Sequence, residues 1–103
     1  MADEARVLDA LGDPTRRAVL ELLRGGERSV RELTDATEVS QPAVSQHLRV
    51  LRDAGLVTVR PEGTRRLYRV DLDGLAGLRQ WVDGFWDDAL AAFVAHAEGE
   101  ARP

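Results

Sequence analysis

The chain has 103 residues, of which 44% are hydrophobic, and its formal net charge at pH 7 is -4. That length suits one domain with a modest core, and the absence of cysteine excludes disulfides, thiolate metal sites and cysteine nucleophiles. An acidic N-terminus and the lack of an apolar run near the roughly 20 residues of a membrane span favour a cytoplasmic protein. We therefore predict one domain over residues 1–98 and a flexible tail over 99–103.

The basic residues, all of them arginine, are concentrated in the middle of the chain. Residues 28–70 carry 8 Arg against 5 acidic residues, whereas residues 71–103 carry 2 Arg against 7 acidic residues. Because the distribution of charge matters more than its sum, the middle segment suits a polyanionic partner although the whole chain is acidic.

Three short helices are predicted before the centre of the chain. The apolar positions in residues 7–11 indicate a first helix that Gly12 ends, and it is too short to be stable unless it packs on something larger. Residues 13–14, Asp-Pro, supply the N-cap and first position of a second helix, which the Gly-Gly pair at 25–26 stops. The Ser-x-x-Glu pattern of residues 29–32 is a capping box that opens the third helix.

The stretch 40–52 has two contrasting faces. At about 100° per residue, Val44, Leu48 and Leu51 form an apolar stripe, and the opposite side carries Ser, Gln and Arg. Ser40 is a good N-cap, so we predict that the helix starts there or one residue later. Its polar side chains can reach base edges and phosphates in a DNA major groove, although a merely solvated helix shows the same pattern. Its place directly after the third helix favours a helix-turn-helix.

A β-hairpin is predicted directly after this helix. Residues 56–60 and 65–70 have the composition of strands, and residues 61–64 form the turn, so that the hairpin makes a wing. Only Glu62 opposes the four arginines that flank the turn, which are Arg60, Arg65, Arg66 and Arg69. These side chains could lie along phosphates or in a minor groove, or they could simply keep the edge of the hairpin soluble.

The segment from Asp71 onward predicts a final helix with an unusually wide apolar side. The apolar residues there are Leu72, Leu75, Leu78, Trp81, Val82, Phe85, Trp86, Leu90, Phe93 and Val94. A free monomer would expose much of this side, so we predict a two-fold interface formed with the first helix. A second interpretation, compatible with the first, is a small-molecule pocket lined by Trp81, Phe85 and Trp86.

Together these elements predict a mainly α fold with a small β-hairpin, namely a winged helix-turn-helix of five helices and a two-stranded wing. The chain resembles the ArsR/SmtB family of bacterial winged-helix repressors in residues 11–17, 20, 22–23, 40–51, 54–57 and 63–68. The resemblance implies a homodimer joined through the first and last helices and an inverted-repeat operator. It also implies repression relieved by an effector, here a small molecule of unspecified chemistry.

Metal-sensing members of that family carry a cysteine pair in the third helix, or carboxylate and histidine ligands in the last one. Here residues 29–35 contain no cysteine, and the last helix offers several carboxylates but a single histidine, His96. The chain is similar to the metal-independent members, so we expect no metal and no cofactor and interpret His96 as structural or solvated. We find no Gly-rich phosphate loop or nucleophile elbow and do not expect an enzyme.

The main hypothesis is therefore a dimeric, sequence-specific repressor, which could act on its own gene. Gln41, Ser45 and Gln46 would read base edges, and the arginines would contact phosphate or guanine. The DNA-binding set is Ser40, Gln41, Pro42, Ser45, Gln46, His47, Arg49, Arg52, Arg60, Thr64, Arg65 and Arg66. The dimer set is Val7, Leu8, Leu11, Leu75, Leu78, Val82, Phe85, Trp86 and Phe93.

Two alternatives stay open at this point. His47 lies on the flank of its helix, where it could either hydrogen-bond a phosphate or cap the edge of the core. The whole molecule could instead be a winged-helix dimer that binds protein rather than DNA, because a fold does not fix a function.

Overall fold

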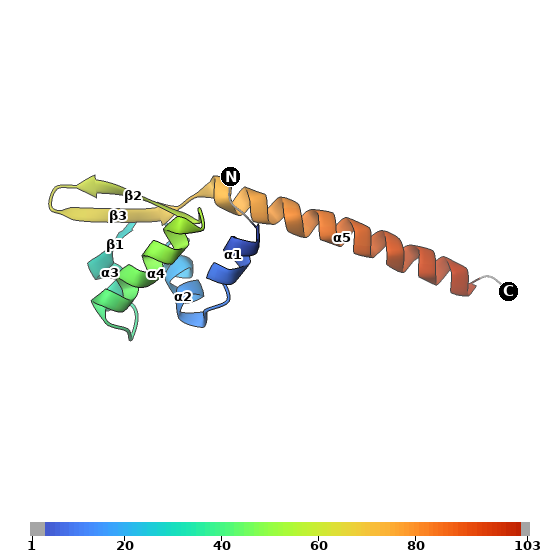
Figure 1. The fold of residues 1–103 in the computed structure, drawn as a ribbon, viewed down its shortest axis with the longest axis horizontal. Coiled ribbons are helices and arrows are strands. Elements are labelled where there is room, and N and C mark those ends of the chain that lie inside the picture. Colours follow the sequence, from blue (N-terminus) through green and yellow to red (C-terminus); the bar gives the residue numbers. More distant parts are fainter. Residues whose placement is uncertain (1–3, 102–103) are drawn as a thin grey trace.

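The computed structural model describes residues 4–101. Its elements in chain order are α1 (Glu4–Ala10), α2 (Pro14–Leu22), β1 (Arg28–Ser29), α3 (Val30–Asp35), α4 (Gln41–Asp53), β2 (Val57–Glu62), β3 (Arg65–Val70) and α5 (Leu72–Ala101). Figure 1 shows helices α1 to α4 gathered on one side of the small sheet, while α5 leaves this body as a long rod. The mainly helical fold with five helices and a wing is confirmed.

The starts of α2 and α3 follow the predicted local signals. Asp13 caps α2, with Pro14 at its first turn. At α3 the backbone N–H of Ser29 donates to Glu32 Oε1 at 3.0 Å, and the N–H of Glu32 donates to Ser29 Oγ at 3.1 Å. Each contact satisfies a donor that has no partner within the helix, so both helices begin where the sequence predicts.

The sheet has three strands, not the two that we predicted. Its order is β1-β3-β2, and β1 pairs antiparallel with β3 through Arg28 opposite Tyr68 and Ser29 opposite Leu67. Two residues are too short to show any alternation, so this strand leaves no signal in the sequence. Ser29 can serve both elements because an N-cap residue has extended backbone angles, here φ -79° and ψ 163°.

The turn of the wing is also tighter than predicted. β2 and β3 pair up to Glu62 opposite Arg65, which leaves Gly63 and Thr64 as the turn. Gly63 has a φ of +61°, in the left-handed region that favours glycine. Pro61 lies within β2, where it is tolerated because β2 is an edge strand of the sheet.

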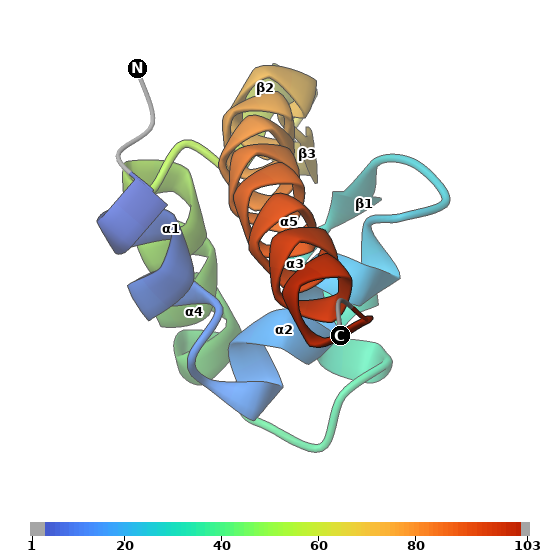
Figure 2. The ribbon, with the colours of Figure 1, turned by 90° about the vertical axis from the view of Figure 1, so that its right-hand side faces the viewer.

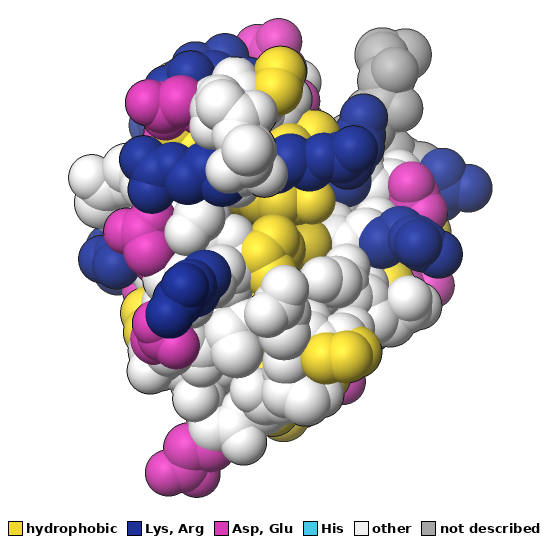
Figure 3. Space-filling view, turned by 90° about the vertical axis from the view of Figure 1, so that its left-hand side faces the viewer, with side chains coloured by type: hydrophobic (Ala, Val, Ile, Leu, Met, Phe, Trp, Pro, Cys, Tyr) yellow, Lys and Arg dark blue, Asp and Glu magenta, His cyan; other side chains and the backbone are white. Residues whose placement is uncertain are grey.

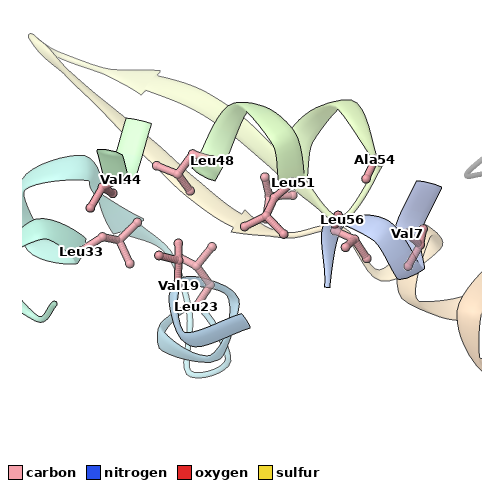
Figure 4. Close-up of a cluster of buried hydrophobic side chains, with 11 residues drawn as sticks. Val7, Val19, Leu23, Leu33, Val44, Leu48, Leu51, Ala54 and Leu56 are labelled. Carbon is pink, nitrogen blue, oxygen red and sulfur yellow. The ribbon is translucent and has the colours of Figure 1, made fainter. Parts of the chain in front are cut away.

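The apolar stripe of α4 is the centre of the core, as Figure 4 shows. Val44, Leu48 and Leu51 are each 0% exposed, and they pack in one cluster with residues from α1, α2, α3 and β2. A fully buried Leu or Val contributes roughly 1.5–3 kcal/mol. This burial fixes the rotation of α4 about its axis and so decides which of its side chains face solvent.

The last helix extends far beyond the body that carries it. α5 has 30 residues, so its length is about 45 Å, and the molecule measures 71 × 27 × 22 Å. Leu75 and Leu78 pack against the core, whereas every side chain from Arg79 to Glu100 is exposed. We call residues 79–100 the arm; Figure 2 looks along it from its free end.

The helix includes Gly99 to Ala101, which we predicted to be part of a flexible tail; residues 102–103 lie outside the described residues. Gly99 alone does not end the helix, because alanines and glutamates, which favour helix, surround it.

At Gly74 the backbone of α5 passes close to the backbone of the body. A Cβ at this position would lie 1.9 Å from the carbonyl oxygen of Gly55. Glycine is therefore required here for the first turn of α5 to contact the segment that follows α4.

Candidate nucleic-acid interface

The outer face of α4 is polar and exposed to solvent. Gln41, Ser45, Gln46 and Arg49 are exposed, on the side of the helix opposite its buried stripe. Ser40 is already engaged, because its Oγ accepts a hydrogen bond from the backbone N–H of Ala43 at 3.3 Å. Of the predicted DNA-binding residues on this helix, Ser40 thus holds the helix start, while all the others except His47 present their side chains to solvent. Pro42 and Arg52 are exposed too.

His47 lies at the edge of the core. It is half-buried, and its Nδ1 is shielded from solvent without a hydrogen-bond partner among the described residues. Its neighbour is Asp13: the pKa of that carboxyl is lowered chiefly by the N–H of Arg16, with a smaller effect from the field of His47. This placement favours the packing role of His47 over a phosphate contact.

Arg60 is held by an acid that no local pattern in the sequence predicts. Its Nε lies 2.7 Å from Glu27 Oε2, and its Nη2 lies 2.9 Å from Glu27 Oε1, which makes a bidentate pair. The guanidinium lowers the pKa of the Glu27 carboxyl, and the carboxylate raises that of Arg60. Glu62 adds a longer contact to Arg60 at 3.6 Å. Glu62 is therefore not the only acid that opposes the wing arginines.

The other arginines of the wing are engaged to different degrees. Arg65 has two long ion pairs, at 3.8 Å to Glu32 and 3.7 Å to Glu62, and exposed pairs of this kind contribute only about 0–1 kcal/mol. Arg69 donates to the hydroxyl of Thr58 at 3.2 Å. Among residues 4–101, no ion pair or side-chain hydrogen bond involves Arg66, which is exposed beside the turn. Arg66 is thus a wing cation that a phosphate could contact without displacing any ion-pair or hydrogen-bond partner of its side chain within residues 4–101.

Figure 3 looks at the molecule from the end where the wing projects. Arginine side chains form a band across the upper part of this face, and the surface below it is mostly uncharged. A cationic wing beside an uncharged polar surface can bind a polyanion through the wing and read hydrogen-bonding groups through the helix.

The central elements of this arrangement match known proteins. A family model described as "Bacterial regulatory protein, arsR family" matches residues 13–59, from the N-cap of α2 into β2. The HTH-type transcriptional regulator Rv2034 of Mycobacterium tuberculosis is 50% identical over 95 residues, which cover 92% of this chain and 89% of that protein. The chain belongs to the arsR family.

Solved structures and a further relative agree with this assignment. A crystal structure of a "possible transcriptional regulator for arsenical resistance" has a TM-score of 0.71 at 48% identity, covering 86% of this chain and 93% of that one. The homodimeric winged helix-turn-helix DNA-binding domain of Mb0332 from Mycobacterium bovis has a TM-score of 0.67 at 38% identity, covering 84% and 80%. The repressor SmtB of Mycobacterium tuberculosis is 48% identical over 64 residues, 62% of this chain and 47% of SmtB.

This arsR-family chain is therefore a transcriptional regulator with a helix-turn-helix, and not an enzyme. None of its helices within residues 4–101 is both long and apolar enough to cross a membrane. The same described residues hold no group of three or more His, Cys, Asp or Glu that could bind a metal ion. The imidazole Nε2 of His96 lies 2.9 Å from Glu100 Oε1, one turn further along the helix.

The predicted dimer residues of this regulator fall into three groups. Val7 is 1% exposed and lies in the core of its own chain, so it has no surface to offer to a partner. Leu11, Leu75 and Leu78 are half-buried. The exposed group consists of Leu8 at 43%, Val82 at 47%, Phe85 at 67%, Trp86 at 63% and Phe93 at 68%.

The aromatic side chains of the arm do not enclose a pocket by themselves. The rings of Trp81 and Phe85 are stacked with their centroids 5.9 Å apart, and both residues are exposed, as is Trp86. All three are on one solvent-exposed helix. A small-molecule site at these residues would therefore need a second protein surface.

Proposed function

We propose that this arsR-family regulator acts in the cytoplasm as a homodimeric repressor that binds an inverted-repeat DNA operator. The observation that carries the proposal is the exposed polar face of α4, whose orientation is fixed by the burial of Val44, Leu48 and Leu51. Two such helices in a two-fold dimer would enter successive major grooves. The similarity to the repressor SmtB supports repression of transcription over activation.

Within this proposal, the residues of α4 and of the wing have different tasks. Gln41, Ser45 and Gln46 read base edges, because hydroxyl and amide groups can both donate and accept hydrogen bonds there. Arg49 contacts phosphate or guanine, and Arg66 contacts the backbone from the wing. Arg60 joins the interface only after it exchanges Glu27 for a phosphate.

The test is a salt titration of binding to DNA from upstream of the protein's own gene, with a scrambled duplex as control. We expect a steep dependence of the dissociation constant on salt and a preference for one inverted repeat. Gln46→Ala should reduce that preference at a cost of about 1–3 kcal/mol, whereas Arg66→Ala should weaken both duplexes alike and reduce the salt slope by about 1.

Two results would contradict the proposal. If Arg66→Ala left the affinity and the salt slope unchanged, the wing would not contact DNA. If the wild-type protein bound no DNA even at low salt, the surface would serve a protein partner instead.

A further inference from the structure

An apolar groove lies on the body beside the root of α5. Its volume is about 290 Å³, and its apolar lining comes from Leu11, Leu20, Val70 and Leu75. Three exposed charged side chains complete it, Arg17, Glu21 and Arg24. The groove therefore combines an apolar floor with a net positive edge, and it lies between the residue that follows α1, helix α2, the end of β3 and the first turn of α5.

The apolar stripe of α5 is covered at its root and bare along the arm. Leu75 starts the stripe, and Val82, Trp86 and Phe93 continue it at intervals of seven, four and seven residues. This spacing keeps the four side chains on one face of a helix. Leu75 packs against the core, whereas the other three are 47%, 63% and 68% exposed. The same face that meets the body at one end lacks any cover at the other.

The α5 helix of a second copy of the chain can cover this exposed face, because apolar residues then lie opposite one another. If two α5 helices pair antiparallel about position 84, Val82 lies opposite the second copy's Trp86, and Leu78 lies opposite its Leu90. The same pairing places the second copy's Phe93 opposite Leu75, which lines the groove. Each of these opposed pairs is apolar, as a two-fold interface between identical helices requires.

We propose that Phe93 of a second copy seats in this groove, and that the contact is made twice across the two-fold axis. The proposal rests on the homodimer proposed above and specifies which surface of the body receives the arm. The charges agree with it, because residues 81–100 carry five acidic residues and no arginine, while the edge of the groove carries one positive charge in excess: Arg24 pairs with Glu21 at 3.3 Å and Arg17 adds a second cation. A phenylalanine is an effective anchor, since such a ring buries about 150–250 Å².

The position of Phe93 in the dimer can be mapped by photo-crosslinking of the full chain. A benzoylphenylalanine in place of Phe93 should form a covalent dimer on irradiation, with adducts in residues 11–24 or 70–75 of the other copy. The matched control carries the same probe in place of Ala91, which lies on the opposite side of α5. That control should give no adduct in the groove.

The energetic test compares two exposed positions of the arm. Phe93→Asp should raise the dimer dissociation constant at least ~100-fold by sedimentation, because it removes the apolar ring that fills the groove and puts a carboxylate against its Leu and Val lining. A contact with Arg17 or Arg24 at the exposed edge of the groove would offset only a small part of that loss. Ala91→Asp introduces the same charge off the stripe and should change the constant by less than about threefold. Both side chains are exposed in one chain, so neither variant should disturb its folding.

The outcomes separate this inference from the proposed homodimer. Adducts confined to the arm of the other copy, or a Phe93→Asp dimer as tight as the wild type, would overturn the groove contact while the dimer stands. A wild-type chain that sediments as a monomer at every concentration would contradict both.

Discussion

Two helices of this molecule, α4 and α5, each have an apolar stripe, and the two stripes differ in how much of them the chain itself buries. That of α4 is completely buried within one chain, whereas most of that of α5 is exposed beyond Leu78. The body thus buries its own apolar stripe and leaves a polar face exposed for binding. The arm leaves its apolar stripe exposed, and bare apolar surface of this extent marks an interaction site.

The largest loss of stability is expected from a substitution that leaves a cavity in the core of the body. Leu48→Ala should lower the free energy of unfolding by about 2–5 kcal/mol, because Leu48 is fully buried and its removal leaves a cavity. Urea unfolding monitored by circular dichroism measures this loss.

The matched control is the next residue, Arg49, which is exposed. Arg49→Ala should change stability by less than about 0.5 kcal/mol and should instead weaken DNA binding. Equal losses of stability in the two variants would show that α4 does not separate its folding face from its binding face.

The contact between the first turn of α5 and the body depends on Gly74. Gly74→Ala places a Cβ against the backbone of Gly55, where no flexible side chain can move aside, and it should destabilise the protein by about 1–3 kcal/mol. Gly77→Ala is the control, since nothing lies within 4 Å of a Cβ there. That variant should stabilise α5 by roughly 0.5–1 kcal/mol through higher helix propensity.

Thermal unfolding of both glycine variants at one protein concentration gives the comparison. A Gly74→Ala protein as stable as Gly77→Ala would mean that the root of α5 can shift away from Gly55 at little cost.

The sequence predicted what depends on neighbouring residues and missed what depends on distant ones. The caps at Asp13, Ser29 and Ser40 are confirmed because each acts on a backbone N–H within three residues. The pair between Glu27 and Arg60 joins residues 33 positions apart, so no local pattern could reveal it. Periodicity likewise identified Val7 as apolar but could not tell whether its own chain or a partner covers it.

The ion pair between Glu27 and Arg60 allows a test of how the wing binds DNA. Glu27→Ala removes the bidentate partner, so Arg60 becomes available to phosphate. We expect tighter binding to any duplex and a salt slope steeper by about 0.9 for each phosphate newly contacted. Titrations at several salt concentrations measure both quantities.

Glu98→Ala makes the same change of net charge on the exposed arm. It should leave the slope unaltered. If it steepened the slope as much as Glu27→Ala does, the effect would come from net charge and not from the release of Arg60.

The smallest expected effect is the contribution of Glu32 to the pH dependence of stability in the body. The backbone N–H of Ser29, followed by its hydroxyl, lowers the pKa of this carboxyl below its ordinary value of 4.5. A group whose pKa is lower in the folded state stabilises the fold above its unfolded pKa and loses that contribution as the pH falls through the folded one. The wild-type protein should therefore lose stability below about pH 4.5.

Glu32→Gln keeps an acceptor for the N–H of Ser29 but cannot be protonated in this range. The variant should be less stable than the wild type near neutral pH, because a charged acceptor binds the N–H more strongly. Its urea midpoint should also fall less steeply as the pH is lowered. Parallel losses in the two proteins would place the pH dependence elsewhere, with Asp13 the next group to test, since its pKa is lowered by the same kind of contact at the start of α2.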